Sequence, residues 1–186
     1  MGTIKTTNIE SISGSGTVTL GTSGETFTVP SGVTATGFNN PAFQAYLSSA
    51  QSISDGVTTK VEIDTEDFDT GGMYDNSTNY RFTPTVAGKY MAYGSTVGYA
   101  GAVTDVVSSQ VLIYKNGSYY AGSEENYNGN FIQRSYNVVT AIIDMNGSSD
   151  YLELFGYVNG NSGGGEEFSV TGGARGNIFG AYRIGT

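Results

Sequence analysis

The 186-residue chain contains no cysteine and no histidine. Without cysteine there is no disulfide framework, no thiolate metal site and no cysteine nucleophile. Without histidine the chain lacks the usual general base, the Ser-His triad, the commonest metal ligand and the histidine pH switch. These absences together favour a protein that is not an enzyme.

Carboxylates remain as candidate catalytic groups, because a glycoside hydrolase needs only two acids that flank a bond. The acidic pairs are Glu124 with Glu125, Glu166 with Glu167, and Asp150 with Glu153. Adjacent residues of a strand point to opposite faces, and no motif places two of these acids across a cleft. Carboxylate-dependent glycoside hydrolysis is therefore the third of three functional hypotheses.

Positive charge is also scarce, since 8 Lys and Arg stand against 17 Asp and Glu, for a net charge of -9. Such a chain repels phosphate backbones and anionic membranes, so we expect no nucleic-acid partner. The first residues, MGTIKTTNIESIS, hold one Lys and no apolar run of seven, which does not match an export signal. No window approaches 18 apolar residues, so we expect no membrane insertion.

Glycine is abundant at 28 residues, and Tyr at 14 exceeds Phe at 9. Aromatic and β-branched residues suit pleated, half-buried strands, while Gly and Asn supply the backbone angles of tight turns. The length allows one β-domain with a short extension. The composition therefore predicts an all-β chain, with an extension over residues 1–32 and the main domain over residues 33–186.

The extension reads as short alternating strands that are rich in Gly, Ser and Thr. Its few apolar positions cannot form a core of their own, so they are expected to dock against another surface. These predicted docking residues are Val18, Leu20, Phe27 and Val29.

The main domain shows a series of β-rich runs that are separated by turn residues. The predicted strands are 42–50, 58–64, 79–83, 88–98, 106–115, 118–123, 131–144, 150–158, 166–171 and 176–184. Asn116-Gly117 between two of these runs predicts a hairpin with a type I′ turn. Ten strands at this spacing predict a sandwich or a jelly roll.

Several segments resemble the jelly-roll domain that the complement C1q heads share with the tumour necrosis factor superfamily. They are Phe43–Leu47 (FQAYL), Gly72–Asp75 (GMYD), Asn79–Tyr90 (NYRFTPTVAGKY), Ser149–Leu154 (SDYLEL) and Asn177–Tyr182 (NIFGAY). Two departures are Ser149, where the family usually has Gly, and the lack of a collagen stalk before the domain. Cytokine or immune function does not follow, because function belongs to loops and partners rather than to the fold.

The resemblance implies a ten-stranded jelly roll that assembles as a homotrimer. Apolar strand faces would then lie along the threefold axis. The residues predicted at this interface are Tyr151, Phe155, Tyr157, Phe179 and Tyr182.

The extension resembles the short β-rich leaders of bacteriophage fibre and head-decoration proteins. This resemblance implies a virion structural protein, assembled in the host cytoplasm, on a capsid, a head fibre or a tail fibre. Capsid or tail proteins would then be its partners. The alternative hypothesis is an adhesion module that binds a host receptor or glycan.

Two further groups of residues are candidate binding sites. The acidic run Asp64–Asp69 offers oxygen donors for calcium, with Asp67 and Asp69 as the predicted ligands, although the EF-hand spacing fails. A solvated charged loop is the alternative, and no other cofactor is expected. Tyr119, Tyr120 and Tyr127 could contact a sugar, and the alternative is the common tyrosine with a buried ring and a hydrated hydroxyl.

Overall fold

The computed structural model describes residues 40–129, 131–171 and 173–185. The described residues all belong to one compact unit, Asn39–Thr186. The predicted boundary between residues 32 and 33 lies outside the described residues. The predicted docking segment, residues 1–32, lies outside the described residues. In the described part, no helix is long and apolar enough to cross a membrane.

Thirteen strands and one 3-10 turn, Ala174–Gly176, make up the regular structure of the described residues. The strands are β1 (Ala42–Tyr46), β2 (Gln51–Ser52), β3 (Thr59–Lys60), β4 (Thr65–Thr70), β5 (Tyr74–Asp75), β6 (Arg81–Phe82), β7 (Gly88–Ala100), β8 (Val106–Lys115), β9 (Ser118–Asn126), β10 (Arg134–Met145), β11 (Leu152–Gly160), β12 (Glu166–Phe168) and β13 (Ile178–Gly185). The prediction of an all-β domain is confirmed.

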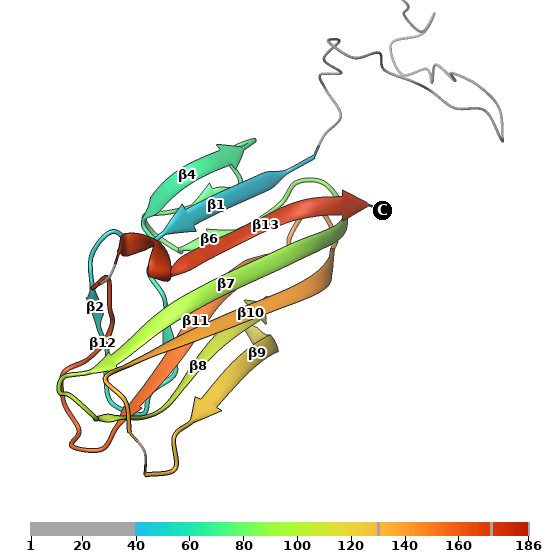
Figure 1. The fold of residues 1–186 in the computed structure, drawn as a ribbon. Coiled ribbons are helices and arrows are strands. Elements are labelled where there is room, and N and C mark those ends of the chain that lie inside the picture. Colours follow the sequence, from blue (N-terminus) through green and yellow to red (C-terminus); the bar gives the residue numbers. More distant parts are fainter. Residues whose placement is uncertain (1–39, 130, 172, 186) are drawn as a thin grey trace, which may run out of the picture. The chain divides into compact units, whose positions relative to one another are not determined.

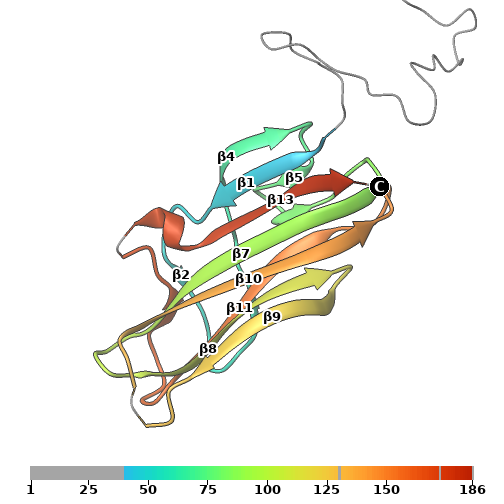
Figure 2. The same ribbon diagram turned by 45° about the vertical axis from the view of Figure 1, so that its right-hand side comes forward.

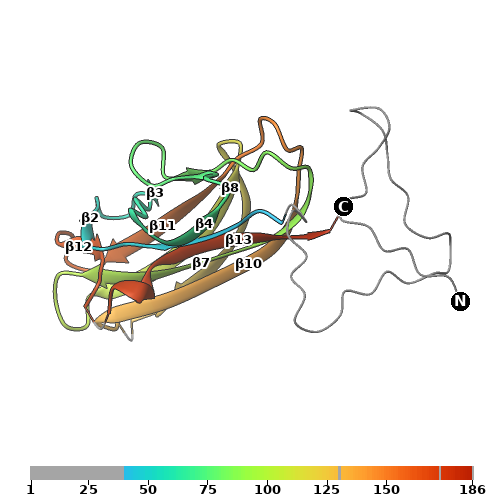
Figure 3. The ribbon, with the colours of Figure 1, turned by 90° about the horizontal axis from the view of Figure 1, so that it is seen from above.

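The strands form two antiparallel sheets that lie face to face, as the view from above shows (Figure 3). Sheet A runs β2, β12, β7, β13, β1, β4, with β10 paired to β7 as well. Sheet B runs β5, β6, β11, β8, β9, with β3 paired to β11. In Figure 1 the strands β7 and β10 of sheet A pass in front of β11 of sheet B.

Each of the ten predicted strands overlaps a strand of the structure, and β2, β4 and β5 are additional. The acidic run Asp64–Asp69, for which a solvated loop was the alternative to a calcium site, lies almost entirely in strand β4. Carboxylates are tolerated there because β4 pairs only with β1 and forms an edge of sheet A, where charged side chains are common.

The core lies between the sheets and is centred on aromatic rings. Alternation along β1 turns Phe43 and Ala45 inward. The Phe43 ring stacks on Tyr74 at 4.5 Å and on Phe82 at 4.6 Å, and meets Phe179 edge-on at 5.1 Å. This cluster joins sheet A, through Phe43 and Phe179, to sheet B.

One end of the sandwich is held by a hydrogen-bonded group of turn residues. Asn116 and Gly117 both have positive φ, 53° and 74°, so the predicted type I′ hairpin between β8 and β9 is confirmed. The Asn116 side-chain amide donates to Asp150 at 2.8 Å and accepts from the Tyr151 N–H at 2.9 Å. The Lys115 ammonium lies 2.9 Å from the same Asp150 carboxylate.

The aromatic cluster generates a prediction about stability. Phe43→Ala leaves a cavity among three rings, so we expect the free energy of unfolding to fall by about 3–5 kcal/mol. Urea denaturation followed by circular dichroism measures this change. The control is Val103→Ala, whose side chain is 69% exposed, and we expect a change of no more than ~0.5 kcal/mol there. Equal effects of the two substitutions would contradict the assignment of the core.

Candidate functional site

The outer face of sheet A carries exposed apolar side chains, which are clearest on β10. Alternate residues of this strand, Val139, Ile143 and Met145, point into the core. Tyr136 and Val138 point outward and are 60% and 63% exposed. Both faces of β10 therefore carry apolar side chains, although the other described residues cover only one of them.

The register of the sheet extends this apolar surface across its other strands, which lie side by side in Figure 2. Ile142 of β10 lies opposite Met91 of β7, and Met91 lies opposite Tyr182 of β13. We call this surface the apolar face of sheet A. It comprises Tyr46, Phe68, Met91, Tyr93, Tyr136, Val138, Ile142, Ile178, Tyr182 and Ile184.

A chain of polar contacts crosses the apolar face. The Tyr93 hydroxyl donates to the Gln44 amide oxygen at 2.7 Å, and the Gln44 amide nitrogen donates to Asp67 at 2.8 Å. Arg175 donates to the same carboxylate, and its guanidinium lies 4.7 Å from the centre of the Tyr46 ring. The hydrogen bonds from Arg175 and then Gln44 lower the pKa of Asp67, and burial raises the pKa of Tyr93.

The carboxylates predicted to hold calcium point to different partners. Asp67 lies on the outer side with Gln44, whereas Asp69 lies opposite the inward-facing Phe43 and accepts from the Tyr74 N–H at 2.8 Å. Within the described ranges, no three acidic side chains come together in a way that could hold a metal ion. The structure therefore does not bring Asp67 and Asp69 to a common site.

The five residues predicted at the trimer interface lie in three different places. Tyr182 is part of the apolar face of sheet A and is 46% exposed. Tyr151, Phe155 and Tyr157 precede or belong to β11 of sheet B and are half-buried. Phe179 is fully buried between the sheets of its own chain, so it has no surface to offer a sister chain. The prediction is corrected for Phe179, which is a core residue.

The tyrosines predicted to contact a sugar are also separated. Tyr119 is 62% exposed and lines a groove between β8 and β9. Tyr120 follows on the opposite side of β9, and its hydroxyl donates to the Ile142 carbonyl at 3.2 Å. Tyr127 packs against the core and donates to Glu125, and burial followed by this bond raises its pKa.

Four of the six carboxylates considered for hydrolysis, those of Glu125, Asp150, Glu153 and Glu166, take part in structural contacts. Glu153 forms an ion pair with Lys60 at 2.5 Å, and Asp150 forms one with Lys115. Glu166 is 2% exposed and accepts from the N–H of Gly164. Their contacts stabilise turns and strands, and this structural role accounts for these carboxylates without a catalytic function.

Sequence reasoning missed most of the apolar face of sheet A. The signal was present, because Tyr136, Val138 and Ile142 occupy alternate positions of a predicted strand. The intervening Val139 and Ile143 are equally apolar, so the alternation does not say which set is covered by the chain itself.

Comparisons with solved structures show the same arrangement of strands in three proteins. Murine APRIL matches with a TM-score of 0.54 at 10% identity, over 78% of this chain and 99% of that one. The globular domain of zebrafish complement 1qA protein matches at 0.53 and 11%, over 77% and 97%. Eiger TNF from S. frugiperda matches at 0.52 and 7%, over 78% and 91%.

The fold is the jelly roll of the tumour necrosis factor and C1q domains. No protein-family model matches the sequence, and a search of curated proteins gives no match. At these identities the likeness shows the jelly roll alone. The fold that the sequence resemblance implied is confirmed.

The polar contacts of the jelly roll generate a prediction about acid stability. The pKa of Asp67 is lowered in the folded state, so its stabilising contribution is present above the unfolded pKa, about 3.9, and is lost as pH falls through the folded pKa. We expect Asp67→Asn to flatten the fall in melting temperature between about pH 5 and pH 2. Thermal unfolding by circular dichroism measures the profile, and Glu62→Gln, an exposed carboxylate, is the control. A wild-type profile in Asp67→Asn would contradict this account.

Proposed function

We propose that the chain is a non-enzymatic structural and adhesion protein that works as a homotrimer, in which each copy covers the apolar face of sheet A of a neighbour. The observation that carries this proposal is the exposure of six large apolar side chains on one sheet face, namely Phe68, Tyr136, Val138, Ile142, Tyr182 and Ile184. Contiguous exposed apolar surface of this kind marks association sites.

The surroundings of the face also support an interface. Lys89 and Asp144 form an ion pair at 3.1 Å at the edge of the face, and both side chains are largely exposed. An apolar centre with a charged rim is the usual anatomy of a protein interface. The number of copies, three, comes from the resemblance to the C1q and tumour necrosis factor jelly rolls.

In this proposal the protein is a component of a bacteriophage virion, which is assembled in the host cytoplasm. Residues 1–32 dock on a capsid, a head fibre or a tail fibre, with Val18, Leu20, Phe27 and Val29 as the contact residues. Their resemblance to phage leaders supports this assignment. The domain itself is suited to display, since β1 begins where β13 ends. The described residues of the connections at 101–105, 127–129, 131–133 and 161–165 lie at the opposite end.

The proposed trimer interface leads to a prediction about the effect on assembly of a charged residue on the apolar face of sheet A. Val138→Asp places a carboxylate on the apolar face of sheet A, where desolvation in the interface penalises it, so we expect the trimer to dissociate. Sedimentation velocity at micromolar concentration measures the mass. Val103→Asp is a matched control, because Val103 is also highly exposed, at 69%, but lies in the β7–β8 connection.

Wild type and Val103→Asp are expected to sediment as trimers, and Val138→Asp as a monomer with an unchanged circular dichroism spectrum. A monomeric wild type would overturn the proposal. A Val138→Asp protein that stays trimeric would place the interface elsewhere.

The virion assignment has its own test. Deleting residues 1–32 is expected to abolish incorporation into particles while residues 33–186 still fold and form trimers. Immunoblots of purified phage measure incorporation, and sedimentation of the truncated protein reports trimer formation. Undiminished incorporation of the truncated protein would contradict the docking role.

A further inference from the structure

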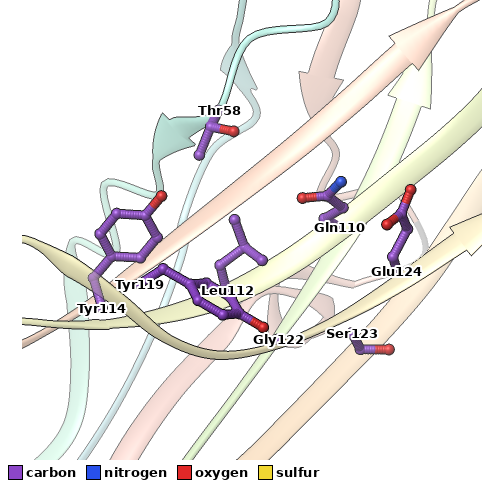
Figure 4. A pocket seen from close by; sticks show the side chains of 8 residues that line it. All are labelled: Thr58, Gln110, Leu112, Tyr114, Tyr119, Gly122, Ser123 and Glu124. Atoms are coloured by element: carbon purple, nitrogen blue, oxygen red, sulfur yellow. The ribbon is translucent and has the colours of Figure 1, made fainter.

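A groove opens on the outer face of sheet B, opposite the sheet that carries the apolar face. It has a volume of about 310 Å³ and lies over β8 and β9 (Figure 4). This size is at the lower limit of small-molecule sites. Its lining consists of Thr58, Gln110, Leu112, Tyr114, Tyr119, Gly122, Ser123 and Glu124.

The groove exists because a side chain is missing from its floor. Gly122 of β9 lies opposite Leu112 of β8, and its backbone is extended, so any residue could adopt its conformation. A Cβ atom there would come within 2.5 Å of the Leu112 Cδ2 atom and 3.2 Å of the Tyr119 ring. Glycine at this position therefore provides space rather than backbone freedom.

One wall of the groove is aromatic and held in place by its neighbours. Tyr119 meets Tyr114 edge-on, with ring centres 6.3 Å apart, and Tyr114 stacks on Phe155 of β11 at 4.2 Å. Tyr119 nevertheless stays 62% exposed, whereas Leu112 beneath it is only 8% exposed. This row of three rings thus leaves the Tyr119 ring accessible beside the apolar Leu112 side chain at the bottom of the groove.

The other end of the groove is polar. Gln110 and Glu124 lie opposite each other on β8 and β9, and both side chains point the same way from the sheet (Figure 4). In the described part of the chain, neither side chain enters a hydrogen bond or an ion pair, whereas the neighbouring Glu125 accepts from Tyr127. An amide and a carboxylate are thus available to an incoming ligand.

We propose that this groove binds a neutral saccharide. A sugar ring has a face of C–H groups, which suits the exposed ring of Tyr119, and a rim of hydroxyls, which suits Gln110 and Glu124. Glu124 and the net charge of -9 disfavour acidic sugars. The inference rests on the adhesion part of the proposed function and is independent of the trimer, since every lining residue belongs to one chain.

Saturation-transfer NMR on the full chain tests the proposal. The probes are the methyl glycosides of glucose, galactose, mannose and N-acetylglucosamine, with sialic acid as an acidic comparison. We expect transfer to at least one neutral glycoside and none to sialic acid. No transfer to any neutral probe, or a preference for sialic acid, would overturn the proposal.

Substitutions then locate the binding site. Tyr119→Ala removes the aromatic surface and is expected to weaken binding by roughly tenfold, which corresponds to one aromatic stacking contact. Tyr119→Phe keeps the ring and should retain binding. Gly122→Ala fills the floor and should also weaken binding. The matched control is Tyr120→Ala, next in sequence but on the other side of β9, and it should bind as wild type does.

Equal loss in Tyr119→Ala and Tyr120→Ala, or no loss in Tyr119→Ala, would overturn the assignment of the groove. Circular dichroism and sedimentation of the same samples separate this outcome from misfolding and from loss of the trimer. A trimer that does not bind sugar would contradict only the proposal of a saccharide site. A monomer that binds sugar would contradict only the proposal of a homotrimer.

Discussion

The pairing of β7 with β10 determines most of what this molecule presents to its surroundings. The two strands are in register over twelve consecutive residue pairs, and β7 also pairs with β13 and β12 on its other side. A shift of one residue would turn Val139 and Ile143 outward and bury Val138 and Ile142. The core and the apolar face of sheet A thus depend on the same set of backbone hydrogen bonds.

Sequence reasoning succeeded where a residue pattern has one physical interpretation. Asn116-Gly117 indicated a tight hairpin because both residues accept positive φ, and the alternating runs located all ten predicted strands. It failed at β4, because acidic residues are depleted in strands and only the pairing of the edge strand with β1 makes them acceptable. Two-residue strands such as β2 leave no periodic signal at all.

The candidate site residues show more clearly what the sequence pattern leaves undetermined. Phe179 and Tyr182 belong to the same strand, and both were predicted at the trimer interface. Successive side chains of a strand point to opposite faces, so Phe179 is buried between the sheets and Tyr182 is exposed. The composition of the strand gave no reason to assign different environments to Tyr119 and Tyr120. Their roles differ because β9 lies at the edge of sheet B, where one side meets the groove and the other faces β10.

The neighbouring positions of β1 and β13 have a practical consequence. Ala42 is paired with Tyr182, and the Arg183 N–H donates to the Pro41 carbonyl at 3.0 Å, so a linker of a few residues could join the two ends of the domain. New ends could then be opened in the Gly163-Gly164-Gly165 connection at the far end, an exposed site of the kind that tolerates cutting. Such a circular permutant would keep both sheets while reversing the end from which the domain is tethered.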